Sequence, residues 1–157
     1  MTHTQSPRYR VFSDYRVGEL VNTDTRIITD DDVVYFADLS GDHHPAHTNL
    51  EFGKKEFGGR LVHGVLSFAV LVGLTVEENP LAVAYGYDKI RFPNPVLAGD
   101  SITATSEVIS LKGHKNPDIG LVVKQYTGTN QRGEVVVVAQ HTLAVQRNTP
   151  ESVNHPR

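Results

Sequence analysis

Gly64-Val-Leu-Ser-Phe-Ala-Val-Leu-Val-Gly-Leu-Thr-Val-Glu-Glu78 decides the fold, because it is the only long apolar run in the chain. A helix over residues 64–78 would be about 22 Å long and would have almost no polar face. Such a helix must be covered on most of its sides. The run is rich in valine, so a buried strand is the alternative. Because strands usually contain about four to eight residues, the length favours a helix.

The regions on either side of this helix are predicted to form mostly strands. The expected strands are residues 18–28, 81–92, 101–111, 119–129 and 134–145. An antiparallel sheet that curves around the central helix would cover it, so we expect an α+β fold. A single sheet has two open edges, which favours pairing with a second copy of the chain.

Two shorter helical segments are predicted between the first strand and the apolar run. Thr29 is a suitable N-cap, and Asp30, Asp31 and Asp32 follow it in the first turn of a helix over residues 30–39. Acidic residues are favoured at this end of a helix, so we interpret the three aspartates as helix-start charges rather than as a metal site. A further helical turn is expected over residues 49–56.

Length and composition indicate one globular domain. The chain has 157 residues, of which 39% are hydrophobic and 21% are charged. We expect an N-terminal arm over residues 1–16, a single domain over residues 17–147 and a disordered polar tail over residues 148–157. The N-terminal residues have no apolar core, so we expect no signal peptide.

Charge and cysteine content restrict the partners and the chemistry. The net charge of -3 argues against nucleic acid or an anionic membrane as the main partner. The absence of cysteine excludes a disulfide framework and a thiol nucleophile, and it is consistent with a cytoplasmic location. The apolar run is shorter than the roughly 18 residues that a membrane span requires.

The candidate chemistry is concentrated in Gly41-Asp42-His43-His44-Pro45-Ala46-His47, which places four ionisable side chains in seven residues. A carboxylate and an imidazole that share one water can divide the roles of acid and base near neutral pH. Hydration of a polarised C=C bond needs such a pair and a group that stabilises the enolate oxygen. The backbone N–H of Gly64, at the start of the predicted helix, is suited to that last role.

Three segments resemble the MaoC-like dehydratase, or (R)-specific enoyl-CoA hydratase, family. Phe36-Ala-Asp-Leu-Ser-Gly-Asp-His-His-Pro-Ala-His47 is similar to its motif, aromatic-x-x-aliphatic-Ser-Gly-Asp-x-Asn-Pro-aliphatic-His. Val62-His-Gly-Val-Leu66 resembles its His-Gly at the central helix, and Lys89-Ile-Arg-Phe-Pro-Asn-Pro-Val-Leu-Ala-Gly-Asp100 resembles the strand and turn that follow.

The resemblance implies a hot-dog fold and at least a homodimer. It also implies reversible hydration of a trans-2-enoyl thioester of CoA or acyl-carrier protein to the (R)-3-hydroxyacyl thioester, without a metal or redox cofactor. By motif position Asp42 and His47 are the catalytic pair, and the Gly64 N–H is the oxyanion donor. The sequence departs from the motif at His44, which replaces asparagine, and at Ala46, which replaces a larger aliphatic residue. Val72 lies near a position where some members carry serine.

The candidate substrate-binding residues are His44, Pro45, His63, Lys89, Arg91 and Phe92. Lys89 and Arg91 are candidates for the CoA phosphates, and Phe92 either lines the acyl channel or packs a strand end. His63 either orients a backbone group, lines the pocket or has a structural role.

Other functions remain open from the sequence. Asp42, His43, His44 and His47 together offer the ligand types of a zinc site. A thioesterase of the same fold and a non-catalytic acyl-thioester-binding subunit are the two further alternatives.

Overall fold

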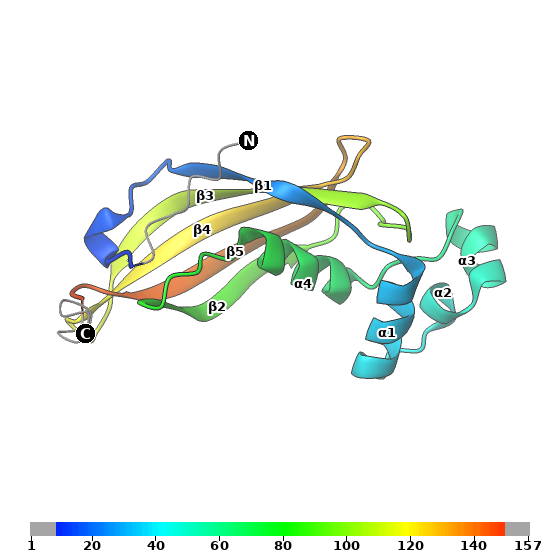
Figure 1. The fold of residues 1–157 in the computed structure, drawn as a ribbon, viewed down its shortest axis with the longest axis horizontal. Coiled ribbons are helices and arrows are strands. Elements are labelled where there is room, and N and C mark those ends of the chain that lie inside the picture. The colour runs from blue at the N-terminus through cyan, green and yellow to red at the C-terminus, as the bar shows by residue number, and fades with distance from the viewer. Residues whose placement is uncertain (1–8, 150–157) are drawn as a thin grey trace, which may run out of the picture.

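An antiparallel five-stranded sheet curves around helix α4 in the computed structural model, which describes residues 9–149 (Figure 1). The strands, in the spatial order β1-β3-β4-β5-β2, are β1 (Leu20–Ile27), β3 (Ser101–Gly113), β4 (Ile119–Thr129), β5 (Val135–Gln146) and β2 (Ala82–Arg91). The helices are the 3-10 turn η1 (Phe12–Asp14), α1 (Asp30–Ser40), α2 (Pro45–Thr48), α3 (Leu50–Phe57) and α4 (Gly64–Thr75). The predicted α+β class is confirmed, and each predicted strand is present with its ends shifted by at most two residues.

Helix α4 packs against the sheet and leaves one stripe exposed, formed by Val65, Ala69 and Gly73. Leu66 and Leu71 are buried toward the sheet, whereas Val65 is 61% exposed. The expectation that the helix is covered on most sides is therefore confirmed, with this one stripe as the exception. The helix also ends at Thr75 and not at Glu78, because the side chain of Glu77 turns aside to bind Lys124 and Arg10.

The main core lies between α4 and the concave face of the sheet. Its fully buried members include Ile28, Val33, Leu71, Ile102, Val136 and Val137. Side chains fill this space completely, since a Cβ on Gly128 would lie 2.8 Å from the side chain of Val137 and 3.3 Å from that of Leu71 on α4. This dense packing fixes α4 on the sheet and therefore fixes where its N-terminus lies.

The N-terminal segment from Arg10 onward belongs to the folded unit. Tyr15 is completely buried in a second core cluster, and the Phe12 ring packs directly on Gly120 of β4. Residues 10–16 of the predicted arm therefore pack on the domain, because the apolar ring of Tyr15 is buried against Val108, Val122 and Leu143. Residues 1–8 and 150–157, which include most of the predicted tail, lie outside the described residues.

Helices α1, α2 and α3 project at one end of the sheet (Figure 1). The predicted N-cap of α1 is confirmed, since Thr29 Oγ1 accepts a bond from the Asp32 N–H and Asp32 bonds back to the Thr29 N–H. Gly41 ends α1 in the left-handed conformation, with φ of 79°. Among residues 9–149, no helix combines the length and apolar character needed to cross a membrane.

Candidate active site

His47 is held in one orientation on the short helix α2. The sequence predicted a loop here, but Pro45 occupies the first helical position, where its missing N–H is not needed. His47 Nδ1 lies 2.7 Å from the backbone oxygen of Leu61. A carbonyl can only accept a hydrogen bond, so Nδ1 carries the proton and Nε2 presents its lone pair. That lone pair faces Asp42.

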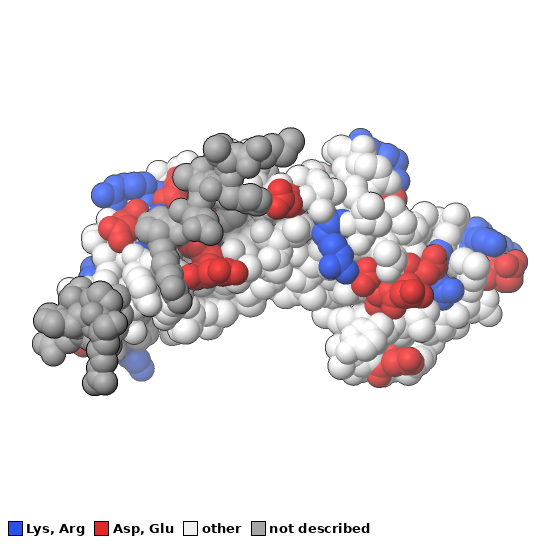
Figure 2. Space-filling model, in the orientation of Figure 1, with Lys and Arg blue, Asp and Glu red and all other residues white. Residues whose placement is uncertain are grey.

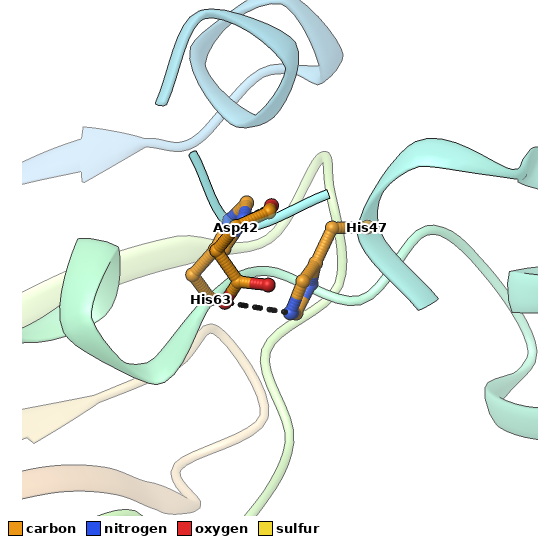
Figure 3. Close-up of side chains that lie close together, drawn as sticks. All are labelled: Asp42, His47 and His63. Carbon is orange, nitrogen blue, oxygen red and sulfur yellow. Dashed lines mark hydrogen bonds and ion pairs between the residues drawn. The ribbon is translucent and has the colours of Figure 1, made fainter. Parts of the chain in front are cut away.

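Asp42 follows the left-handed Gly41, and its two carboxylate oxygens have different environments. Oδ1 accepts a hydrogen bond of 3.2 Å from the backbone N–H of His44, which closes a tight turn. Oδ2 lies 3.9 Å from His47 Nε2 (Figure 3). This separation is too long for a direct hydrogen bond and suits a water that bonds to both groups.

His63 joins the pair from the other side of the site. It is the N-cap residue of α4, its ring is 2% exposed, and Nε2 donates a 3.0 Å hydrogen bond to the backbone oxygen of Asp42. The ring stacks on His47 with 3.7 Å between centroids and 22° between planes. Burial lowers the pKa of His63, so its imidazole is neutral near pH 7.

Arg60 also supports the site, although no sequence pattern selects it. Its Nη1 donates to the backbone oxygen of His47 at 2.7 Å, and its Nε donates to the Asp30 carboxylate at 2.6 Å. Asp30 was interpreted only as a helix-start charge. The pairing spans 30 residues, so no local pattern could have revealed it.

Gly64 begins α4 directly after His63. The first N–H groups of a helix have no partner within the helix and favour negative charge. The Phe92 ring lies so close that a Cβ on Gly64 would be 2.9 Å from it. Phe92 therefore lies beside the start of α4, as expected of a residue that lines the site, and only glycine fits at residue 64 without displacing the ring.

Two of the clustered histidines face away from the pair. The Nε2 of His43 lies 3.0 Å from Asp38, and this bond raises the pKa of His43. The Nδ1 of His44 accepts the backbone N–H of Ala46 as the N-cap of α2, although its ring lies 6.0 Å from that of His47.

The predicted phosphate-binding residues lie on a different element. Lys89 and Arg91 are exposed on the edge strand β2, where the pairing with β5 is irregular. Lys89 has a positive φ of 52°, which side chains other than glycine seldom adopt. The bulge interrupts the regular alternation of side chains between the two faces of the sheet in this part of β2.

The residues that can offer metal ligands differ from the predicted zinc set. Within residues 9–149 they are Asp42, His47 and His63, whose ligand atoms lie within 4.8 Å of one another. An imidazole lone pair lies in the plane of its ring, so two nearly parallel stacked rings do not point at one ion. Turning either ring would break its bond to a backbone oxygen. The arrangement therefore suits a shared water better than a tetrahedral metal ion.

Comparison with known proteins shows which family the chain resembles. A family model described as a MaoC like domain matches residues 13–131. The 3-hydroxyacyl-thioester dehydratase Z of Mycobacterium tuberculosis is 35% identical, and the match covers 68% of this chain and 75% of that protein. The beta-methylmalyl-CoA dehydratase of Chloroflexus aurantiacus is 31% identical, with 90% of this chain and 41% of that protein covered. The chain spans only 30% of the Protein MaoC of Klebsiella aerogenes.

Solved structures share the fold. The MaoC-like dehydratase from Rhodospirillum rubrum matches with a TM-score of 0.79 and 26% identity, over 90% of this chain and 99% of that one. A Mycobacterium tuberculosis protein described as having a double hotdog fold matches with a TM-score of 0.81 at 16% identity, over 91% of this chain and 46% of that one. The predicted hot-dog fold is confirmed.

Proposed function

Because the chain belongs to the MaoC-like dehydratase family, we propose that it catalyses reversible hydration of a 2-enoyl thioester to the (R)-3-hydroxyacyl thioester. The observation that carries this proposal is the 3.9 Å gap between Asp42 Oδ2 and His47 Nε2. A water that lies beside both atoms can bond to each of them and give a proton to either. The relatives named as dehydratases support the same class of reaction, a hydro-lyase.

The pair accounts for every proton in the reaction. The water oxygen forms a bond to carbon 3 while one water O–H bond breaks and its proton moves to the pair. The π electrons of the C2=C3 bond shift toward the thioester carbonyl and give an enolate. The pair then returns one proton to carbon 2, so the site regains its starting state. A positioned acid–base pair of this kind typically contributes about 10²- to 10⁴-fold to the rate.

The backbone N–H of Gly64 is the proposed donor to the enolate oxygen. A helix N-terminus favours a developing anion, and the donor is already oriented before the reaction starts. The stacked rings of His63 and His47 are next to this residue, so the acid–base pair and the oxyanion donor are neighbours in space.

The substrate is proposed to be an acyl-CoA or acyl-carrier-protein thioester. Lys89 and Arg91 are proposed to contact the phosphates of the carrier, and Phe92, His44 and Pro45 to line the acyl side of the site. The small Ala46 and the Chloroflexus relative named for a methylmalyl thioester support a branched or carboxylated acyl group. A strong preference for crotonyl-CoA over such substrates would contradict this part of the proposal.

The central test follows enoyl-thioester absorbance with wild type, Asp42→Asn and His47→Gln. Each substitution keeps the side-chain volume but removes proton transfer, so kcat should fall by at least about 10²-fold in both variants. A smaller loss in either variant would contradict the acid–base pair. Release of free thiol from a saturated acyl-CoA, measured with a thiol reagent, would instead identify a thioesterase.

We also include at least a homodimer in the proposal. Strand β2 is an open edge on which Val83 and Tyr85 are more than half exposed, and Val65 and Val76 are exposed along α4. Figure 2 shows mostly uncharged atoms over α4. Open edges and apolar faces of this kind favour association. Sedimentation should give at least a dimer, which Tyr85→Lys should weaken, and a monomeric wild type would refute it.

The proposed location is the cytoplasm. The absence of cysteine from all 157 residues supports a reducing compartment.

A further inference from the structure

We infer that His63 is a positioning residue that holds Asp42 and His47 together as one unit. It bonds to the main chain of the first and stacks on the ring of the second. This inference rests on the proposed function, since it assigns a role in the same site. It gives a specific task to a residue for which the sequence left three alternatives open.

The bond to Asp42 restrains the turn that carries the carboxylate. The side chain of Asp42 is 55% exposed and has only the local bond to the His44 N–H to fix it. The 3.0 Å bond from His63 Nε2 anchors the Asp42 carbonyl to the start of α4, 21 residues further along the chain. Because α4 is fixed on the sheet by the core, this bond transfers the rigidity of the core to an exposed carboxylate.

The stack on His47 restrains the other member of the pair. His47 Nδ1 is bonded to Leu61, which fixes one edge of the ring but allows tilting about that bond. The face of His63, with Phe36 packed edge-on behind it at 5.0 Å, prevents this tilting. Stacking covers a face of the His47 ring and leaves its Nε2 edge free to exchange a proton.

The neutral state of His63 suits this position. The charged or titratable groups that face it are Asp42, His47 and His43, and burial is the largest influence on its own pKa, which it lowers. A second imidazolium stacked at 3.7 Å would oppose protonation of His47 during the reaction. A neutral ring lets His47 gain and lose its proton without that penalty.

Folding stability does not explain why residue 63 is a histidine. With Nε2 bonded to Asp42, its Nδ1 is buried and has no partner among the described residues. A buried polar atom without a partner costs about 1–3 kcal/mol, a cost that a phenyl ring would avoid. Packing alone would therefore favour phenylalanine, which also fills the space between Phe36 and His47. Its burial also keeps the ring out of direct contact with a substrate.

The test is His63→Phe, which keeps a ring to stack on His47 but removes the donor to Asp42. We expect kcat to fall by about 10- to 100-fold, the range that follows from a small misplacement of a reacting group, with KM nearly unchanged. The free energy of unfolding should stay the same or rise. The matched control is His141→Phe, since His141 on β5 is also buried, also stacks on an aromatic ring and also has an unpartnered nitrogen. It should keep wild-type kcat.

A double-mutant cycle separates positioning from an independent structural effect. If His63 acts through Asp42, adding His63→Phe to Asp42→Asn should reduce the residual rate by less than about threefold. An undiminished kcat in His63→Phe, a full multiplicative loss in the double variant, or a parallel loss of stability and activity would each overturn the inference.

A second readout does not depend on activity. In ¹⁵N NMR spectra His63 should be the Nε2–H tautomer, and the backbone amide signals of residues 41–44 and of Ala46 should broaden in His63→Phe but not in His141→Phe. If wild type hydrates no enoyl thioester, the proposed function fails while these spectra still test the inference. Unchanged amide signals in His63→Phe would refute it.

Discussion

Each end of α4 has a carboxylate close to two nitrogen-bearing side chains, but the two carboxylates differ in how they are bonded. At the N-terminal end, Asp42 lies beside His47 and His63, with 3.9 Å between the carboxylate and the nearer nitrogen of His47. Just past the C-terminal end, Glu77 lies between Arg10 and Lys124 and is bonded directly to both. Each cluster combines one carboxylate with two nitrogen-bearing side chains, yet only in the second do both nitrogens bond directly to the carboxylate.

The difference comes from how completely the carboxylates are bonded. Glu77 accepts bonds from Arg10, from Lys124 at 2.6 Å and from the Tyr15 hydroxyl at 3.2 Å. Burial by itself raises the pKa of Glu77, but the bonds from Lys124 and Arg10 outweigh it and hold the pKa below its ordinary value. A carboxylate bonded in this way has little capacity left to exchange a proton. The open pair at the other end retains that capacity.

The largest expected contrast is between Glu77→Gln and Asp42→Asn. Removing the Glu77 charge takes the ion-pair partner from the buried Lys124 and leaves the buried Arg10 paired with Glu19 alone, so it should lower the free energy of unfolding by about 3–5 kcal/mol. Asp42 is largely exposed, so Asp42→Asn should change it by less than about 1 kcal/mol. Urea unfolding measures both. The folded fraction of Glu77→Gln should keep wild-type kcat, and an equal stability loss in the two variants would remove the contrast.

A second prediction concerns acid and the buried His141. Burial lowers the pKa of His141 to about 4, against an ordinary value of 6.5. Between these values the unfolded chain binds more protons, so stability falls as pH drops from 6.5 toward 4. Since His63 contributes in the same direction, the useful measurement is the difference between wild type and His141→Phe. The variant should lose less stability across this window. Parallel curves of unfolding free energy against pH for the two proteins would contradict the lowered pKa of His141.

The smallest effect is expected from glycine substitutions on α4. Gly64→Ala places a methyl group against the Phe92 ring beside the proposed oxyanion donor, so kcat should fall by about tenfold. Gly73 on the same helix has nothing within 4 Å of an added Cβ. Gly73→Ala should therefore keep kcat and raise stability by about 0.5–1 kcal/mol. Equal kcat values in the two variants would show that the start of α4 takes no part in the reaction.

Local features of the sequence predicted the elements well. The apolar run at Gly64 predicts α4, and Thr29 with Asp32 predicts the start of α1, because caps and apolar periodicity depend on neighbours within a few residues. The end of α4 was predicted three residues too late, because Glu77 is drawn out of the helix by Arg10, which is far away in the sequence.

By itself the sequence determined the helix that organises the fold and the seven-residue segment that holds the candidate acid and base. The motif already selected His47 as the partner of Asp42, but only the tertiary structure decided that His43 bonds to Asp38 and that His44 caps α2. It also brought His63 and Arg60 to the pair. The physical reason is that backbone preferences act over a few residues, whereas the packing of α4 on the sheet sets contacts that span 13 to 21 residues.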